Sequence, residues 1–458
     1  MKYFLTFILV IVGFSIYSQN KQVLYNFSEL PQTLLLNPGA ETNYKLHVGV
    51  PLLSGISGEF GSSGFTLSDL FLSDNRSINN KVSDVISKLN VRDHIKFHSQ
   101  VEVLNGGYRF DDKTYFSFGL YEEIDGILYL PKDVIKLFME GNSAYLNQSF
   151  SASQILYKLD FIGVLHFGVT KKINEKLTVG GRFKIYSSAL NLESSNNSGT
   201  LTTANGINNI YTHYLDNINI NFRTSGLVDS ATDKYIEDGS AYLKNTFLGS
   251  NLGVGFDFGL TYHIDKQLEF SASILDFGFI KHKKNVKTTT IEGNFIFEGI
   301  DLTFNANNGT NYWGDLDQRF RDELPTRETQ ETYISWRPTK LNAALKYSFG
   351  EKRSKYCYDN TYKDFYTNAI GVQLYSVFRP LSPLLALTGF YEKSFSKKIH
   401  AKVTYTIDDY SLYNIGAGIS MQFGKVNFYG VVDNIAQFND ITSANNLSFQ
   451  LGFNIIFN

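Results

Sequence analysis

The chain of 458 residues contains few residues of several types: 1 cysteine, 8 prolines, 3 methionines and 2 tryptophans. A single cysteine, Cys357, excludes an internal disulfide framework. With few prolines, no Gly/Ser tract, no charge block and no obvious repeat, nothing marks a linker between domains. We therefore expect one large unit whose stability comes from an extensive ladder of backbone hydrogen bonds.

Long apolar runs and excess charge are also missing. Beyond the N-terminus no run approaches the roughly 18–20 apolar residues that a membrane helix needs. The net charge of −2 and the lack of a basic patch give no case for nucleic-acid binding. Tyrosine (29), phenylalanine (38) and glycine (37) are abundant, and this mixture favours strands over helices.

The one apolar run stands at the N-terminus. Lys2 precedes an apolar stretch from Tyr3 to Ile16, and Ser18 offers a small residue at a cleavage point before Gln19. This pattern predicts a secretory signal peptide over residues 1–18, because it is too short and badly flanked for a spanning helix. An uncleaved anchor is the alternative. No cysteine follows the cleavage point, so lipid attachment there is excluded.

The last twelve residues, 447–458, alternate between apolar and polar side chains with one exception. Such alternation places the two kinds on opposite faces of a strand, and only Ile456 interrupts the polar face. The pattern is typical of a strand with lipid on one side and a polar lumen on the other. The apolar face consists of Leu447, Phe449, Leu451, Phe453, Ile455 and Phe457.

The same alternation recurs along the chain. A phase slip near Leu275, Phe277 and Phe279 indicates a β-bulge. A membrane protein without membrane helices has one physical solution, a closed barrel, because an open sheet edge cannot be satisfied in lipid. We predict an all-β fold, a transmembrane antiparallel β-barrel of about 14 strands, with 12 to 16 as the range. One of the less regular hairpins is expected to be misassigned. The expected strands are 95–103, 115–122, 161–169, 177–185, 252–262, 268–274, 341–349, 370–374, 384–390, 399–407, 413–423, 426–432 and 447–457, and the less regular ones are 45–50, 55–60, 289–297 and 333–336.

The connections between the expected strands are unequal. Residues 190–245 form a long polar stretch that we expect outside the cell, whereas the turns at Asp265, Lys397 and Lys425 are short and expected in the periplasm. Three connecting segments have helical signals, namely 66–72, 132–140 and 315–324. They either line the barrel mouth or are plain loop helices.

The N-terminal segment, defined here as residues 19–43, does not resemble a strand. Pro31 and Pro38 interrupt ladder pairing, and three consecutive leucines need burial. Two arrangements are open: the segment folds into the barrel mouth as a plug, or it lies in the periplasm against the first strand. Residues 44–458 then form the barrel. The plug candidates are Leu34, Leu35, Leu36, Asn37 and Pro38.

Polar residues on the inner faces of the strands are the candidates for function. They either solvate the lumen or pair with one another, or they form a polar path or binding cavity in which Asp257 and Glu269 face Arg182 or Lys184. His94 and His98 are also expected on the lumen side. The lumen-facing candidates are Arg182, Lys184, Asp257, Glu269, Lys346, His400 and Lys402.

Motifs for catalysis or metal binding are missing. The chain has no G-x-S-x-G, C-x-x-C or H-E-x-x-H motif, so we expect no enzyme, cofactor or metal. Asp229-Ser-Ala231 matches a short O-glycosylation acceptor pattern, and Cys357 is expected to be an inert loop residue.

Five short stretches resemble a family of uncharacterised outer-membrane barrels from gliding-type Gram-negative bacteria. They are Leu34–Gly39, Gly180–Lys184, Gly253–Gly259, Ser273–Phe279 and Tyr429–Asn434. The Asn-Pro and Asp-Asn pairs are more distantly similar to PorP/SprF proteins of type IX secretion. Such families resemble the long-chain fatty acid transporters, which are barrels with an N-terminal hatch. The resemblance implies fold and an outer-membrane location, and transfers no active residue. Asn458 departs from the aromatic residue on which barrel chains commonly end.

Three classes of function follow. The first is a channel or transporter for a small or hydrophobic molecule. The second is a structural or partner-binding barrel beside a type IX secretion or gliding apparatus. The third, a barrel enzyme, lacks a matching motif. The expected partners are outer-membrane lipid, the barrel-assembly machinery and envelope secretion or motility proteins.

Overall fold

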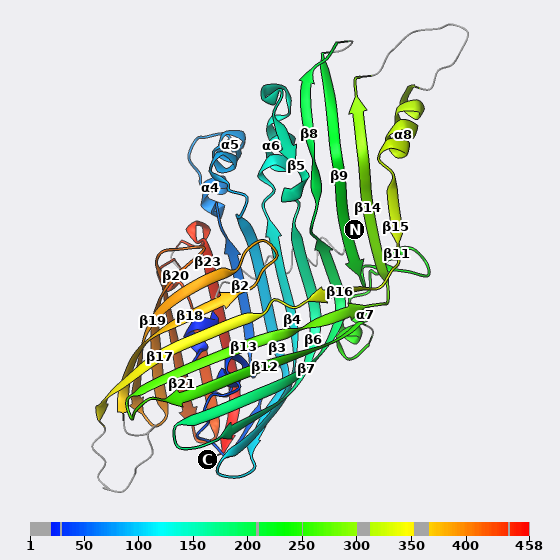
Figure 1. Cartoon of the computed structure of the whole chain (residues 1–458). Helices are drawn as coiled ribbons and strands as arrows, with labels where there is room; N and C mark the ends of the chain where they lie inside the picture. Colours follow the sequence, from blue (N-terminus) through cyan, green and yellow to red (C-terminus); the bar gives the residue numbers. More distant parts are fainter. Residues whose placement is uncertain are drawn as a thin grey trace.

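The computed structural model describes residues 20–27, 30–207, 210–249, 251–299, 312–351, 366–437 and 440–457. The predicted signal peptide and Cys357 lie outside these ranges. The chain is 58% strand and forms a closed antiparallel barrel of 14 strands (Figure 1). This confirms the predicted fold class. The wall consists of β1 (Leu46–Gly49) with β2 (Ile56–Ser62), β3 (His94–Arg109), β4 (Thr114–Tyr129), β6 (Tyr157–Lys172), β7 (Leu177–Ser194), β12 (Asn251–His263), β13 (Leu268–His282), β16 (Tyr333–Trp336) with β17 (Lys340–Glu351), β18 (Tyr366–Val377), β19 (Leu384–Ser396), β20 (Ile399–Asp408), β21 (Asn414–Phe423), β22 (Val426–Val432) and β23 (Asn446–Phe457).

The barrel closes between its first and last strands, as Leu46 pairs with Phe457 and Ile56 pairs with Leu451. The first wall position is split, however. β1 and β2 both pair with β3 and β23, so the sequence segments expected as a hairpin form one interrupted strand. Residues 50–55 occupy the interruption, where Leu52 has a φ of 64° and an exposed side chain.

The β-bulge predicted near Leu275 is confirmed. The pairing of β12 with β13 shifts between Phe256 and Phe258, and Asp276 adopts a φ of 56°. The extra residue allows Phe277 to point outward and Asp276 to point into the lumen, where it is 3% exposed.

The two ends of the barrel differ. At the end near the C-terminus, neighbouring strands such as β12 and β13 are joined by short turns; we call it the short-turn end. The opposite, long-loop end has most of the helices (Figure 1). The segments predicted at 66–72, 132–140 and 315–324 are helical, as α4 (Leu67–Phe71), α6 (Lys132–Glu140) and α8 (Tyr312–Glu323). Helices α5 (Ile78–Lys88) and α7 (Gly239–Thr246) were not predicted.

A sheet extends from the wall at the long-loop end. The segment expected to be a long polar loop, residues 190–245, instead contains β8 (Ser198–Asn205), β9 (Tyr211–Ser225), β10 (Val228–Asp229), β11 (Lys234–Tyr235) and α7. β9 pairs with Asn191–Glu193 near the end of β7 and with β14 (Val286–Phe297). β14 in turn pairs with β15 (Thr326–Thr329). The predicted strand 289–297 therefore lies in this extension and not in the wall. β5 (Ser149–Ser151) joins β8 at its edge.

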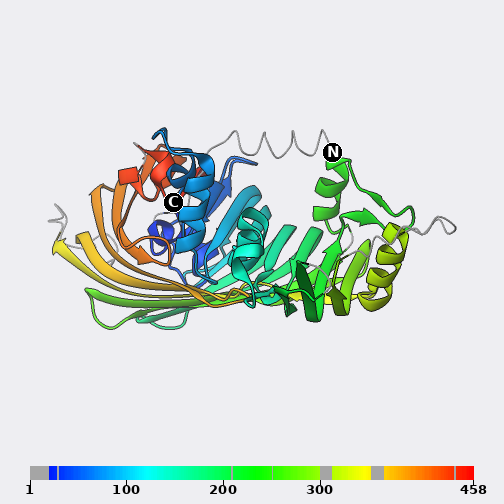
Figure 2. The same ribbon diagram turned by 90° about the horizontal axis from the view of Figure 1, so that it is seen from above.

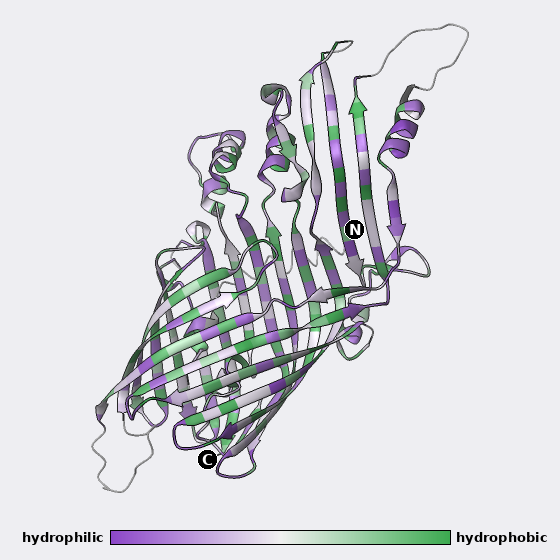
Figure 3. Cartoon of the chain, in the orientation of Figure 1, coloured by the Kyte–Doolittle hydropathy of each residue, from purple (hydrophilic) through white to green (hydrophobic). Residues whose placement is uncertain are grey.

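Hydrophobic and hydrophilic residues alternate along the strands of the wall (Figure 3). On β12, Val254, Phe256 and Phe258 are exposed on the outer face, whereas Asp257 is fully buried on the inner face. This alternation is what a lipid-facing wall with a polar lumen requires. Among the described residues, no helix combines the length and apolarity needed to cross a membrane.

The described part of the N-terminal segment, residues 20–27 and 30–43, lies inside the barrel, enclosed by the wall (Figure 2). It contains α2 (Asn20–Leu24) and α3 (Thr33–Leu36). Its apolar residues pack with Leu275, Ala344, Tyr429 and Val431 of the wall. Ile456, the one residue that interrupts the polar face of the last strand, is 4% exposed and belongs to a buried cluster with Leu34, Ala40, Tyr44 and Tyr115. An apolar residue on the lumen face thus has an apolar partner.

Candidate functional site

The Asn37-Pro38-Gly39 turn of the N-terminal segment rests directly on the wall at two glycines. A Cβ atom on Gly180 would lie 1.9 Å from the Pro38 carbonyl oxygen, and one on Gly259 would lie 2.1 Å from Asn37 Oδ1. No side chain fits at either position, so glycine is required for this close approach. The turn is closed by the Gly39 amide, which donates to Asn37 Oδ1 at 2.9 Å.

The wall holds the segment through its backbone carbonyl groups. Lys402 donates to the Tyr25 carbonyl at 2.6 Å, just after α2, and Arg182 donates to the Leu34 and Leu35 carbonyls in α3. Cations at the C-terminal ends of helices interact favourably with the exposed carbonyl groups. Three wall hydroxyl groups also donate to carbonyl oxygens of the segment. These hydrogen bonds run from Ser273 to Leu36 at 2.6 Å, from Thr170 to Pro38 at 2.6 Å and from Thr261 to Gly39 at 2.9 Å.

Gln32 joins the segment to the seam where the barrel closes. Its side-chain nitrogen donates to the Ser54 carbonyl at 2.9 Å and to Asn454 Oδ1 at 3.0 Å. Ser54 lies in the interruption of the first strand, and its carbonyl also accepts from the Tyr429 hydroxyl at 2.9 Å. The segment therefore contacts both sides of the seam.

A network of ion pairs fills the lumen beside α3. Asp257 accepts from Arg182 at 3.2 Å and from Lys184 at 2.8 Å, and Asp276 lies 2.6 Å from both Lys184 and Lys340. Nearer the long-loop end, two arginines form ion pairs with three carboxylates. The distances are 2.6 Å for Arg337–Glu123, 3.2 Å for Arg337–Asp160 and 2.7 Å for Arg379–Asp125. These five cations and five carboxylates balance in charge, and the side chain of each is less than one-tenth exposed.

The predicted lumen residues divide between two places. Arg182, Lys184 and Asp257 come together, as the hypothesis of a polar cluster required. Glu269 does not face Arg182 or Lys184, so that part of the hypothesis was wrong. It pairs with Lys346 at 3.2 Å, because its position on β13 lies close to the short-turn end.

The remaining predicted residues also lie towards the short-turn end. Lys402 is fully buried and pairs with Glu392 at 3.0 Å, and half-buried His400 contacts Ser394 Oγ at 2.9 Å. His94 and His98 face inward, as expected. His94 contacts the Tyr410 hydroxyl at 2.8 Å, and His98 lies 3.6 Å from Asp125.

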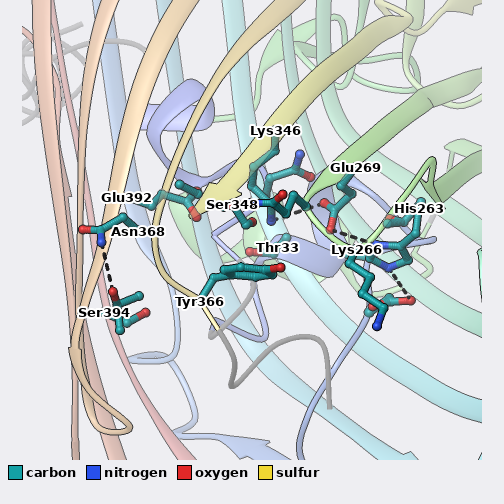
Figure 4. Close-up of a pocket in the computed structure, with 17 residues that line it drawn as sticks. Thr33, His263, Lys266, Glu269, Lys346, Ser348, Tyr366, Asn368, Glu392 and Ser394 are labelled. Atoms are coloured by element: carbon teal, nitrogen blue, oxygen red, sulfur yellow. Dashed lines mark hydrogen bonds and ion pairs between the residues drawn. The ribbon is translucent and has the colours of Figure 1, made fainter. Parts of the chain in front are cut away.

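A polar cavity of about 100 Å³ separates the N-terminal segment from the wall at the short-turn end (Figure 4). The segment contributes Thr33 and Glu41, and the wall contributes Glu269, Lys346 and His263. His263 Nε2 lies 3.3 Å from Glu41 Oε1 and thereby links the wall to the end of the segment. The cavity leaves this side of the segment accessible to water.

A second cavity, of about 500 Å³, is apolar and lies between α8 and the extended sheet. We call it the apolar groove. The sheet contributes side chains from β8, β9 and β14, and α8 covers one side. Its lining residues are Leu201, His213, Leu215, Phe295, Phe297, Leu316, Asp317 and Phe320.

Several network residues escaped prediction from the sequence. Asp276 follows the bulge, where the alternation changes phase, so its face could not be assigned from strand period. Arg337 and Arg379 lie just beyond β16 and β18, where no strand period applies. Prolines follow both arginines directly, and this shared Arg-Pro pair is the signal that could have indicated them.

Burial also alters the acidity of the N-terminal segment. The loss of solvation at Tyr25, which is fully buried, raises the pKa of its hydroxyl to about 12. The phenol is therefore neutral at any physiological pH. Among the residues described by the structure, no group of three or more His, Cys, Asp or Glu side chains is arranged to hold a metal ion.

These features define a class: a transmembrane-type β-barrel of 14 strands whose N-terminal segment occupies the lumen. The chain belongs to a family of unknown function, DUF5723, whose family model matches residues 38–433. The prediction of an uncharacterised barrel family is thus confirmed. The matched range includes four of the five resembling stretches almost completely, and they meet at the contact between the N-terminal segment and the wall. No curated protein matches the chain.

Among solved structures, the chain is similar in fold to outer-membrane proteins at very low identity. A FadL homologue from Pseudomonas aeruginosa shares 10% identity with a TM-score of 0.44, covering 94% of this chain and 95% of that one. The toluene transporter TodX from P. putida shares 10% identity with a TM-score of 0.37, covering 95% and 91%. The translocator domain of the autotransporter NalP from Neisseria meningitidis shares 8% identity with a TM-score of 0.31, covering 91% and 90%. Similarity at this level does not transfer a function.

Proposed function

We propose that this protein is an outer-membrane channel for small or hydrophobic molecules, closed at rest by its N-terminal segment acting as a plug. The observation that carries the proposal is the way the segment is held. It is attached to the wall through hydrogen bonds to its carbonyl groups, from donors such as Arg182, Lys402 and Ser273. Such bonds can be exchanged for bonds to water, so the lumen can be opened without breaking a covalent link.

The width of the barrel supports the same proposal. Barrels of about 8 strands are filled by wall side chains alone, whereas those of about 16–18 strands enclose an aqueous channel. A barrel of 14 strands is wide enough to need an additional element in its lumen, and the N-terminal segment supplies it. Outside the wall, the apolar groove offers a surface of the right chemistry for a hydrophobic molecule before entry.

The location belongs to this proposal as well. The exposed apolar side chains on the outer faces of the strands suit a lipid bilayer, and residues 1–18 have the pattern of an export signal. We infer the outer membrane of a Gram-negative bacterium, with the short-turn end in the periplasm and the long-loop end outside.

Flux through reconstituted protein tests the proposal. Liposomes containing the full chain are to be compared with liposomes containing Arg182→Gln and Lys402→Gln together, by swelling in sugars of increasing size and by uptake of an apolar fluorescent probe. We expect low flux for the wild type and a several-fold increase for the double variant, because both helices of the segment lose a holding cation. The matched control is Arg76→Gln with Arg321→Gln, since both side chains are more than one-half exposed and lie in connections beyond the wall. The absence of flux for every solute in both the wild type and the double variant would reject a channel.

A further inference from the structure

A cluster of buried oxygen atoms lies at the long-loop end of β22 and β23, outside the network described above. It includes the Asp433-Asn434 pair, one of the motifs by which the sequence resembles its family. Six side-chain oxygens in this cluster lack a well-aligned hydrogen bond among the described residues, although Ser448 lies close enough to act on the Asp433 carboxylate, and the residues that carry them are at most 1% exposed. They are Asp433 Oδ1 and Oδ2, Asn434 Oδ1, Asn446 Oδ1, Ser448 Oγ and Thr404 Oγ1.

The strand register brings these side chains to one place. The Asp433 amide donates to the Ser448 carbonyl at 3.0 Å, and the Asn434 side chain donates to the Asn446 carbonyl at 2.7 Å. Thr404 pairs with Gly416 on the next strand. Asp433 Oδ1 and Thr404 Oγ1 lie only 2.1 and 2.5 Å from the position that a Cβ atom on Gly416 would occupy. The missing side chain of Gly416 thus makes room for the carboxylate.

The cluster has an excess of negative charge. No lysine, arginine or histidine within the described ranges forms an ion pair with Asp433. The charged groups that act on it are two more carboxylates, Asp408 and Glu59, of which Glu59 already pairs with Lys96. Asp408 accepts from Asn446 at 3.1 Å, and the lysine that acts on it is Lys96, which already pairs with Glu59. The unpaired donors among the described residues of this cluster are Asn414 Nδ2 and the hydroxyl groups of Thr404 and Ser448, and the Ser448 hydroxyl acts on the Asp433 carboxylate.

A buried carboxylate without a cation is costly, because hydroxyl donors alone replace only part of its lost hydration. Carboxylate, amide-carbonyl and hydroxyl oxygens are the ligands that hard cations prefer. We propose that Asp433, Asn434, Asn446, Ser448 and Thr404 bind one hard cation, such as Ca²⁺, Mg²⁺ or Na⁺, at the long-loop end of the barrel. The site is independent of the proposed channel function.

The site is also next to the N-terminal segment. Val23 of α2 has a methyl group 2.7 Å from the same Cβ position on Gly416, so α2 covers the oxygen cluster from the lumen side. A bound cation would fix Asp433 beneath α2 and tie β20, β22 and β23 together. We therefore expect cation binding to stabilise the whole barrel and not only the loop.

Thermal unfolding of the purified full chain in detergent tests the site. After treatment with EDTA, the protein is to be titrated with CaCl₂, MgCl₂ or NaCl at constant ionic strength, balanced with tetramethylammonium chloride. Binding at saturation should raise the unfolding temperature of the wild type by about 2–5 °C with at least one of the three cations. The rise should disappear in Asp433→Asn and in Gly416→Ala, whose new methyl group displaces the carboxylate.

Two matched variants separate the site from general effects. Asp440→Asn removes an exposed carboxylate from the same connection, and Gly389→Ala adds a methyl group where nothing lies within 4 Å. Both should keep the rise. Equal rises in unfolding temperature in the wild type and Asp433→Asn would overturn the proposal. So would a wild type whose unfolding temperature shows no saturable rise with any of the three cations, and Asp433 would then be neutral in the folded protein. If Gly416→Ala does not fold, equilibrium dialysis decides: one bound ion fewer in Asp433→Asn supports the site, and equal numbers reject it.

Discussion

At the scale of residues, the contact between the N-terminal segment and the wall depends on glycines that admit the chain and on cations that hold it. Gly180 and Gly259 lie in neighbouring strands and are paired in register. Together they form a flat surface on which the Asn37-Pro38-Gly39 turn rests. The neighbouring residue Arg182 then reaches over the turn to the carbonyl groups of α3.

Replacing Gly180 with alanine should displace this turn. The added Cβ atom would lie 1.9 Å from the Pro38 carbonyl oxygen and 2.2 Å from its carbon, and backbone atoms cannot rotate away. We expect a loss of about 1–3 kcal/mol in the free energy of unfolding, as for other overpacked sites. Denaturant unfolding measures it, and proteolysis should cleave the N-terminal segment faster. Gly389→Ala is the control and should change neither. Unaltered stability and proteolysis in Gly180→Ala would show that the segment is not seated on this surface.

Arg337 should be among the most costly residues to truncate. It is buried and holds both Glu123 and Asp160. Arg337→Ala removes the closest cation from two buried carboxylates, which costs about 3–5 kcal/mol of unfolding free energy. Denaturant titration checks this value. The control Arg321→Ala removes an exposed arginine that pairs with Asp317 and should have little effect, because solvent screens that pair. Similar losses in both variants would contradict the expected role of burial.

The sequence allowed part of this site to be predicted. Strand alternation placed Arg182, Lys184 and Asp257 on the lumen face, since a period of two assigns a side to every residue of a regular strand. It could not show that Glu269 lies too near the short-turn end to reach them, because the stagger between strands is a property of the closed barrel. Nor could it assign Asp276, where the bulge inverts the alternation.

At the scale of elements, the long alternating strands were predictable and the irregular ones were not. β12 and β23 have unbroken apolar faces, and such faces are specified locally. The split of the first wall position into β1 and β2 depends on both halves pairing with β3 and β23, and these contacts are distant in sequence. Helix α5 has an amphipathic pattern whose apolar side meets Leu130 and Ile95. Without that contact its pattern is too short to distinguish from a loop.

The apolar groove gives a prediction at this scale. Phe297 lines the groove, whereas the adjacent residue Ile296 is 42% exposed on the opposite face of β14. Phe297→Ser should weaken the retention of an apolar fluorescent probe several-fold, because it removes apolar lining from the groove. Fluorescence titration of the purified protein measures the change. Ile296→Ser serves as the control, and an equal loss of affinity in both variants would place the probe elsewhere.

At the scale of the whole molecule, the outer surface of the wall is a band of exposed apolar side chains. Phe258, in the middle of β12, is 54% exposed on this band, and Phe138 on α6 is 86% exposed in a connection beyond the wall. In water these two residues would be equivalent. In a membrane only Phe258 would meet lipid.

A lysine at these two positions should therefore distinguish them. Phe258→Lys in lipid bilayers should cost about 2–4 kcal/mol of folding free energy, because it places a charge on the lipid face. Phe138→Lys should leave the folding free energy nearly unchanged. Reversible unfolding in lipid vesicles measures both. Equal effects of the two substitutions would mean that the apolar band does not face lipid.

The position of the N-terminal segment also has a consequence for assembly. The segment is joined to β1 and lies within the lumen beside the seam where the first and last strands meet. Gln32 contacts Ser54 on one side of this seam and Asn454 on the other. The segment can thus act as a template that aligns the two ends of the sheet when the barrel closes.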